Sequence, residues 1–127
     1  MTIFINKLLK NEPLTVFGDG EQKRDFVYVK DVAKATVLAM EKDIGSQKIN
    51  VGSGKVFSVN DFVKLTKEKL NPNAIVNYEP GRPGEPRTTI ADITKLKKML
   101  GFTPETDLKD KLNEIIEWNK KCNKDLK

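Results

Sequence analysis

Glycine and proline divide this chain into short segments, and their spacing limits the possible folds more than any other feature. Proline lacks the amide hydrogen that helices and central strands need, and glycine favours turns and helix ends. Each stretch between them has room for one helix and at most one short strand. With 127 residues, the chain is long enough for one domain and too short for two ordinary ones. The breaks lie at Pro13, Gly18, Gly20, Gly45, Gly52, Gly54, Pro72, the stretch from Pro80 to Pro86, and Gly101.

Apolar residues recur at helical spacing in several of these stretches, which predicts amphipathic helices. The clearest beginning is at Ser58, because Asp61 three residues later completes a capping-box pattern. Asp31 is expected to cap another helix, and Gly101 to end one. The predicted helices are Thr2–Lys10, Val32–Met40, Val59–Leu70, a helix through Leu100 capped by Asp92 or Thr94, and a last helix capped by Asp107.

Short runs of β-branched and aromatic residues alternate with these helices and predict strands. The alternation favours an α/β fold with few short strands and flanking helices. Because the strands are so few and short, a complete sheet is not obvious. The predicted strands are Leu14–Phe17, Asp25–Val29, Lys48–Val51, Ile75–Tyr78 and Thr88–Ala91.

Composition removes several classes of function. The sequence contains no histidine, which excludes histidine-based acid–base catalysis, Ser-His-Asp triads and most zinc sites. The net charge of +5 is spread along the chain rather than gathered in a patch, so nucleic-acid binding is not expected. No apolar run is long enough to span a membrane. A single cysteine, Cys122, and no recognisable export signal favour the cytoplasm.

Two segments with glycine turns and arginines are candidates for phosphate binding. In Gly18–Phe26, a double-glycine turn leads to Arg24, whose planar guanidinium can bind a phosphate through two hydrogen bonds. A hairpin turn with a surface Arg24–Asp25 pair explains the same spacing. In Gly81–Arg87, two arginines lie in a stiff loop rich in proline and glycine, which is either a ligand-binding loop or a surface connection.

A third segment, Ile49–Gly54, contains the glycines of a nucleotide-binding loop but fails both familiar patterns. Phe57 stands where a dinucleotide motif needs its third glycine. Val56 stands where a phosphate loop needs serine or threonine. Taken alone, the segment is a strand-to-helix connection.

In their order along the chain, these segments resemble the C-terminal region of the extended short-chain dehydrogenase/reductase family. That family contains UDP-glucose 4-epimerases, which the chain resembles most, and dTDP-glucose 4,6-dehydratases. Each piece is weak alone, but the ordered set covers nearly the whole chain. The resemblance rests on Val16–Gly20 with Gln22, Arg24–Val29 with Asp31 and Val32, Ile49–Gly54, Arg82–Glu85, Ala91 and Asp92, Leu100–Phe102 with Pro104, and Glu117 with Trp118.

The resemblance implies a substrate site for a UDP- or dTDP-sugar. Arg24 and Arg82 match arginines that grip the diphosphate, and Asn50 matches an asparagine near the phosphates or ribose. Glu85 matches a ribose-binding position that is often aspartate, one methylene shorter. Val16 and Gln22 lie where the family lines its base pocket. Leu100, Gly101 and Trp118 are interpreted as packing residues.

The family's NAD-binding and catalytic motifs are missing from this sequence. The resemblance implies G-x-x-G-x-x-G and Tyr-x-x-x-Lys, but Tyr28 is followed by Val32 and Tyr78 by Arg82. We therefore expect residues 1–127 to be one nucleotide-sugar-binding domain without the N-terminal NAD-binding Rossmann domain, inactive alone, with no catalytic, cofactor or metal residues. NAD belongs to the full-length family.

The sequence leaves alternatives open. These are a piece of a 4,6-dehydratase, a non-catalytic module that binds nucleotide diphosphates, and an interaction module. Apolar residues on more than one face of Val32–Met40 predict a surface for the missing N-terminal half or for self-association. No membrane or nucleic-acid partner is expected.

Overall fold

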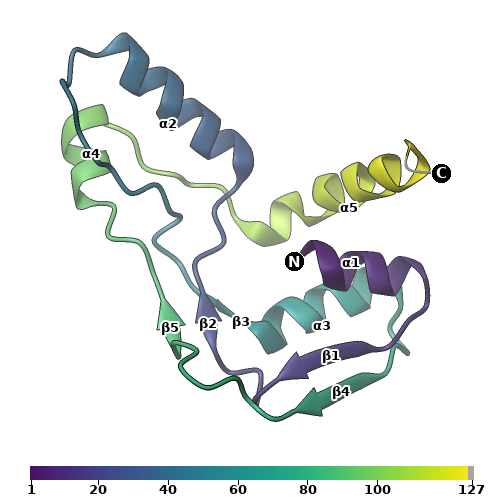
Figure 1. Ribbon diagram of the computed structural model, residues 1–127. Helices are drawn as coiled ribbons and strands as arrows, with labels where there is room; N and C mark the ends of the chain where they lie inside the picture. Colours follow the sequence, from purple (N-terminus) through teal and green to yellow (C-terminus); the bar gives the residue numbers. More distant parts are fainter. Residues whose placement is uncertain (126–127) are drawn as a thin grey trace.

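The computed structural model describes residues 1–125, and the side chains of residues 1–122. It is a mixed α/β structure shaped as an open arch with two lobes (Figure 1). In chain order the elements are α1 (Thr2–Leu9), β1 (Leu14–Phe17), β2 (Lys23–Arg24), α2 (Val29–Glu41), β3 (Phe57–Ser58), α3 (Val59–Leu70), β4 (Val76–Glu79), β5 (Thr88–Thr89), α4 (Thr94–Leu100) and α5 (Leu108–Asp125).

The larger lobe contains α1, α3 and α5 with a two-stranded parallel sheet. Strand β1 pairs with β4 in the register Leu14 to Val76. Helices α1 and α3 contact each other, and α5 contacts α1. Their apolar faces form two adjoining cores. One core contains Ile5, Phe62 and Leu112. The other contains further residues of α1, β1 and α3, among them Leu8, Leu14 and Val63. This lobe holds most of the buried apolar surface.

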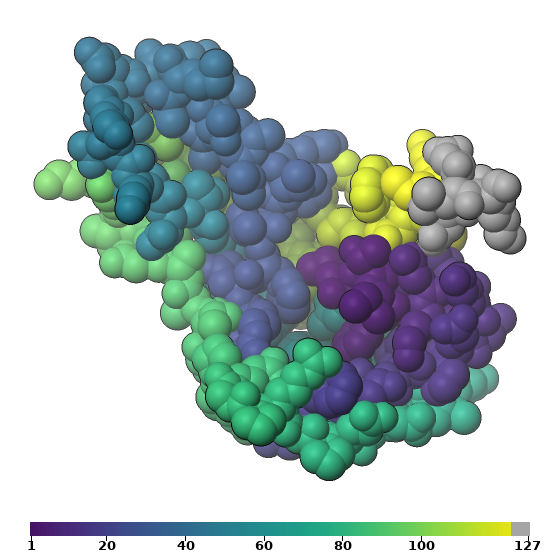
Figure 2. Space-filling view, viewed as in Figure 1, coloured from purple at the N-terminus to yellow at the C-terminus, as the bar shows by residue number. Residues whose placement is uncertain are grey.

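The smaller lobe consists of α2, α4 and the segment 42–56. Its core is formed by four buried residues, Ala35, Leu96, Leu100 and Phe102. A three-stranded sheet in the order β3-β2-β5 connects the two lobes. Figure 2 shows a recess between α2 and α1, where the lobes face each other.

Several predicted elements are confirmed. Helix α1, strand β1 and helix α3 lie within a residue of their expected bounds. Ser58 and Asp61 form the capping box, with the Asp61 amide donating to Ser58 Oγ at 2.9 Å. Gly101 ends α4 in the left-handed conformation. The amide of Lys109 donates to Asp107 Oδ1, which places the last helix where it was expected.

Two predicted strands and two predicted caps are wrong. Helix α4 begins at Thr94 with Ile93 as its N-cap, so neither Asp92 nor Thr94 caps it. Residues Asp25–Val29 form no strand, because the chain leaves the sheet after Arg24 and enters α2. That helix begins at Val29, so Asp31 lies in its first turn instead of capping it. Residues Lys48–Val51 form no strand either, because no strand among residues 1–125 is paired with them.

None of the helices in the described residues is both long enough and apolar enough to cross a membrane.

Candidate functional site

A cavity of about 460 Å³ lies between α1, β1 and the loop that follows β4. Strand β1 contributes three consecutive residues to its lining, Thr15, Val16 and Phe17. We refer to it as the β1 cavity. It is lined by Ile3, Phe4, Lys7, Thr15, Val16, Phe17, Gln22, Val59, Glu79, Arg82 and Glu85.

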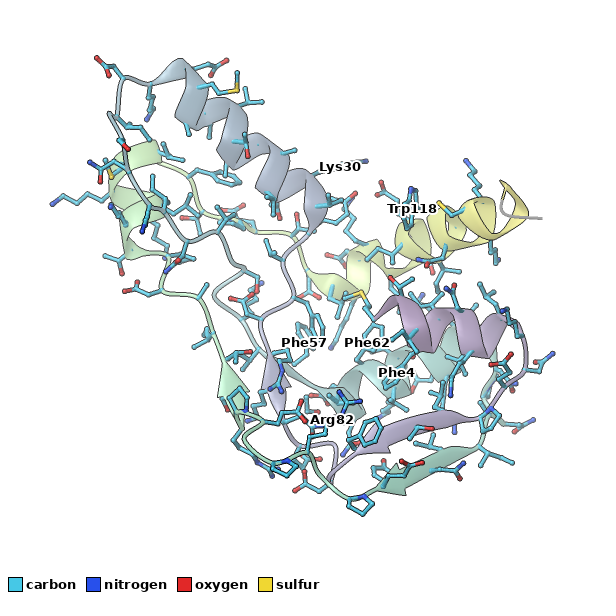
Figure 3. All side chains as sticks on the ribbon, viewed as in Figure 1. Phe4, Lys30, Phe57, Phe62, Arg82 and Trp118 are labelled. Carbon is cyan, nitrogen blue, oxygen red and sulfur yellow. The ribbon has the colours of Figure 1, made fainter. Side chains whose placement is uncertain are left out.

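Arg82 lies in this cavity against an aromatic ring. Its guanidinium carbon is 4.1 Å from the centre of the Phe17 ring, a cation–π contact. Figure 3 shows the Arg82 side chain directed from its loop toward the inner face of the arch, on the side of Phe4. The Glu85 amide donates to the carbonyl of Arg82 at 3.2 Å, so these two residues begin and end one turn.

Arg24 reaches the same turn from β2. Its Nη2 donates to Glu85 Oε1 at 2.7 Å and its Nη1 to the carbonyl of Pro86 at 2.9 Å. Glu85 lines the cavity, whereas Arg24 contacts it only through Glu85. The guanidinium fork thus fixes the end of the turn that carries Arg82.

Val16 and Gln22 both line the cavity, but each is mostly enclosed. Val16 is 2% exposed and packs in the core of the larger lobe. Gln22 donates from Nε2 to the carbonyl of Phe17 at 2.7 Å, which closes the Gly18–Gly20 turn. Both residues therefore shape the wall of the cavity more than they offer free polar groups.

Asn50 lies apart from the other residues predicted for the site. It is exposed in the smaller lobe, and its Nδ2 donates to the carbonyl of Asp92 at 3.4 Å. It does not line the β1 cavity. Four of the six predicted residues therefore share one cavity, Arg24 joins them through Glu85, and Asn50 does not.

Asp19 and Arg87 form a two-point ion pair beside the cavity that sequence reasoning did not single out. Arg87 Nη1 and Nη2 lie 2.7 and 2.8 Å from Asp19 Oδ1 and Oδ2. The hydrogen bonds from Arg87 lower the pKa of Asp19 to about 2. The only local signals were an aspartate between two glycines and a second arginine in the loop.

Asp25 was likewise interpreted only as a surface partner of Arg24, yet it connects three segments. Its carboxylate accepts hydrogen bonds from Ser53 N and Oγ at 2.8 and 2.6 Å, and from the amides of Gly54 and Ala91 at 3.2 Å each. Burial opposes ionisation of Asp25, but these hydrogen bonds outweigh it and lower its pKa. Gly52 has to be glycine here, since a Cβ would lie 2.4 Å from the Cβ of Ala91.

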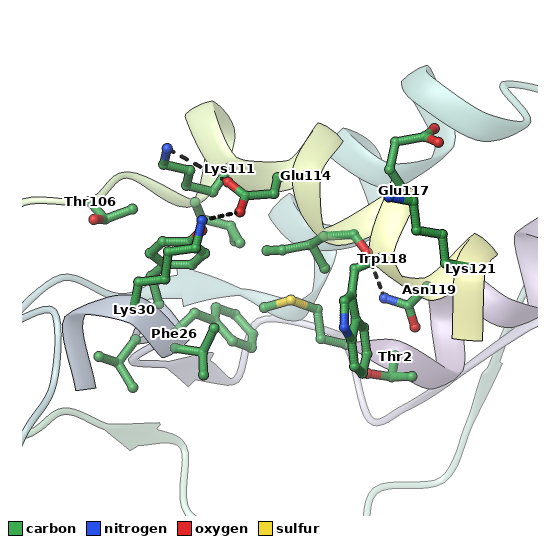
Figure 4. A pocket seen from close by; sticks show the side chains of 16 residues that line it. Thr2, Phe26, Lys30, Thr106, Lys111, Glu114, Glu117, Trp118, Asn119 and Lys121 are labelled. Atoms are coloured by element: carbon green, nitrogen blue, oxygen red, sulfur yellow. Dashed lines mark hydrogen bonds and ion pairs between the residues drawn. The ribbon is translucent and has the colours of Figure 1, made fainter. Parts of the chain in front are cut away.

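A second and larger cavity of about 690 Å³ lies in the recess, where the first residues of α1 and α2 face α5. We refer to it as the recess cavity. Figure 4 shows Trp118 extending from α5 toward Thr2, and Trp118 is 61% exposed. The sequence interpretation of Trp118 as a packing residue is therefore wrong for this structure. The other walls of the recess cavity include the apolar residues Met1, Phe26, Val29 and Ile115.

Charged residues lie at both ends of the recess cavity, with Glu117 and Lys121 near Trp118 and Lys30, Lys111 and Glu114 at the other end (Figure 4). Lys30 Nζ on α2 is 2.6 Å from Glu114 Oε1 on α5, an ion pair that joins the two lobes. The hydrogen bond from Lys30 lowers the pKa of Glu114. Among the described residues, no group of three or more aspartates, glutamates or cysteines is arranged to hold a metal ion.

Comparison with known proteins gives consistent matches. A family model described as GDP-mannose 4,6 dehydratase matches residues 1–115. The chain is 40% identical over 124 residues to a putative UDP-glucose 4-epimerase of Methanocaldococcus jannaschii, covering 98% of this chain and 40% of that protein. It is 33% identical over 118 residues to the UDP-glucuronate 4-epimerase of Thermodesulfobacterium geofontis, covering 92% of this chain and 36% of that protein.

Solved structures agree in fold. The UDP-glucose 4-epimerase of Thermotoga maritima with UDP-glucose matches with a TM-score of 0.85 at 40% identity, covering 94% of this chain and 38% of that one. The UDP-glucuronic acid 4-epimerase of Bacillus cereus, with UDP-glucuronic acid and NAD, matches with a TM-score of 0.85 at 36% identity and the same coverage of both chains. The chain thus spans two fifths or less of the length of these proteins.

Proposed function

The chain belongs to the extended short-chain dehydrogenase/reductase family of epimerases and dehydratases, and on that premise we propose that it is the nucleotide-sugar-binding part of an NAD-dependent sugar epimerase. One observation carries the proposal: Val16, Gln22, Arg82 and Glu85 line a single cavity. The relatives also include UDP-glucuronic acid decarboxylases, at 34% identity or less. We prefer a UDP-sugar 4-epimerase because the relative and the solved structure that reach 40% identity are both named as 4-epimerases. A reducing cytoplasm suits a chain with one cysteine.

In this proposal the β1 cavity binds the nucleotide and Arg82 binds the diphosphate. Lys7 and Arg82 are its two basic residues, and Arg24 stands behind Glu85 with its charge half-buried. Charge-assisted bonds from a planar guanidinium to phosphate are strong and directional. Anchoring the diphosphate, which does not react, holds the sugar where catalysis requires it, so that binding energy is used for positioning.

The residues of this chain do not fit NAD. The glycine turn at Gly52–Gly54 most resembles a pyrophosphate-binding loop. However, the amides of Ser53 and Gly54 already donate to the Asp25 carboxylate. A second anion at these donors would be repelled by that carboxylate. We therefore assign NAD binding, and the catalytic tyrosine and lysine, to protein outside this sequence.

The recess cavity is proposed as the contact surface for that other part. Trp118 and Val29 both line this cavity and are 61% and 70% exposed. Apolar side chains this exposed and this close together mark interaction surfaces. The unpaired segment 48–51 offers backbone groups for a neighbouring strand. Self-association through the same surface is the competing outcome.

Titration calorimetry with UDP and UMP tests the proposal. We expect UDP to bind more tightly than UMP, because only UDP presents a diphosphate to the arginines. Arg82→Ala should weaken UDP binding, whereas Lys95→Ala, which removes an exposed charge on α4, should not. If the chain binds UDP but shows no catalysis when it is mixed with an NAD-binding partner, the non-catalytic module is favoured. If it does not bind UDP, the interaction module is favoured.

A further inference from the structure

The loop from Pro80 to Arg87 is held by polar and cation–π contacts rather than by buried side chains. Every residue from Pro80 to Ile90 is exposed, so the loop has no buried side chain of its own. Backbone contacts fix its two ends: the Gly18 amide donates to the carbonyl of Glu79 at 2.8 Å, and the Lys23 amide to that of Arg87 at 2.8 Å. Between these ends lie Arg82 and Glu85, the two loop residues that line the β1 cavity.

The Asp19 side of the Arg87 ion pair is firmly placed. Asp19 Oδ1 also accepts from the Glu21 amide at 2.9 Å, and its carbonyl accepts from Asn60 Nδ2 at 2.9 Å. Asn60 also donates to Glu21 Oε1 at 2.6 Å and accepts from the Tyr78 hydroxyl at 3.0 Å. Helix α3 and strand β4 thus hold the turn to which Arg87 is bound.

We propose that Arg87, through its ion pair with Asp19, is a positioning residue that holds the Arg82–Glu85 turn over the β1 cavity. The proposal rests on the proposed function, because it assigns the turn to nucleotide binding. Neither Arg87 nor Asp19 lines the cavity. The turn is held from one side by Arg24, which binds Glu85 and Pro86, and from the other by the Asp19–Arg87 pair.

The exposure of this pair separates positioning from a general stabilising role. The side chains of Arg87 and Asp19 are 64% and 55% exposed. Exposed ion pairs contribute little to global stability because water and salt screen them. Losing the pair should therefore leave the unfolding temperature near that of the native chain. Losing the pair should instead weaken UDP binding, because an ordered Arg82–Glu85 turn is needed at the β1 cavity.

Amide hydrogen exchange in the full chain tests the first half of the proposal. The variants are Arg87→Ala and Asp19→Asn, with Lys95→Ala as a control that also removes one exposed basic charge. We expect faster exchange at the Glu85 amide in both variants and unchanged exchange in α5. Equal exchange at Glu85 in the native chain and both variants would overturn the proposal, whatever the ligand does.

UDP titration tests the second half. We expect UDP affinity to fall roughly three- to tenfold in each variant, a loss typical of a site that is less preorganised. The double variant should lose no more than either single one, because both substitutions break the same pair. Additive losses, or a looser loop with undiminished UDP affinity, would overturn the proposal. If the native chain does not bind UDP, the proposed function fails, and the exchange data alone decide whether the pair holds the loop.

Discussion

Arg24 and Glu85 are joined by an ion pair of 2.7 Å although 61 positions separate them in the sequence. The pair connects the central sheet to the loop that carries Arg82. One guanidinium fork therefore fixes the wall of the β1 cavity, and Arg24 influences the cavity without lining it.

Replacing Arg24 should weaken UDP binding more than a surface substitution can. Arg24→Ala removes its bonds to Glu85 and to the carbonyl of Pro86, and a charge beside the proposed diphosphate site. We expect a loss of roughly ten- to a hundredfold in UDP affinity by calorimetry. Arg24→Lys should restore only part, because lysine lacks the planar fork. Full affinity in the lysine variant would contradict this role.

Asp25 should matter for stability at neutral pH. Its carboxylate accepts four hydrogen bonds that connect the segment after β2, the Ser53–Gly54 turn and the segment after β5. Asp25→Ala leaves these donors without their partner and should cost about 2–3 kcal/mol of unfolding free energy. Urea unfolding at pH 7 measures this cost. Asp31→Ala, in the first turn of α2, is the matched control and should cost much less.

The same carboxylate predicts a pH dependence. The folded-state pKa of Asp25 lies below its ordinary value, so its contribution to stability is fully present above the unfolded pKa of about 3.9. That contribution is lost as the pH falls through the folded-state pKa. Urea midpoints measured from pH 7 downward should thus fall more steeply in the native chain than in Asp25→Asn. Parallel curves would show that Asp25 is not linked to folding.

The recess cavity should bind hydrophobic dyes. Trp118, Val29 and Met1 line it, and all three are exposed. We expect dye fluorescence with the folded chain and concentration-dependent association by sedimentation. Trp118→Glu should reduce both signals, whereas Ile75→Glu, at an exposed site before β4 and away from the recess, should not. A strict monomer that binds no dye would count against this surface.

The chain alone should show no epimerase, dehydratase or dehydrogenase activity. Neither Tyr28 nor Tyr78 is followed by a lysine four residues later, and Asp25 occupies the glycine-turn amides. Assays with NAD and several UDP- and dTDP-sugars measure this directly. Turnover above a no-protein control that copurifies with the chain would refute the expectation.

The parts of the fold that sequence predicted well depend on local interactions. Helix α3 is an example, since the Ser58–Asp61 box is formed by residues three positions apart. The strand predicted at Lys48–Val51 failed for the opposite reason. A strand needs a hydrogen-bonded neighbour, and none among the described residues supplies one. Trp118 was misjudged similarly, because its exposure depends on what covers α5.

The same distinction between local and long-range interactions applies to the candidate site. Resemblance singled out Arg82 and Glu85, and the structure places both at one cavity. The Asp19–Arg87 pair and the contact of Asn60 with the Asp19 carbonyl join residues 68 and 41 positions apart. No spacing rule predicts such contacts, because they form only when α3 and the loop after β4 meet the Gly18–Gly20 turn. The binding roles of the six residues stay predictions.

The location of bound UDP decides whether the β1 cavity is the nucleotide site. Backbone amide chemical shifts should be recorded during a titration of the isotope-labelled chain with UDP. We expect the largest changes at Phe17, Gln22, Arg82 and Glu85 around the β1 cavity, and small changes at Trp118 in the recess. Saturating changes centred on Trp118, or none at the β1 cavity, would contradict the assignment of this cavity to a nucleotide sugar.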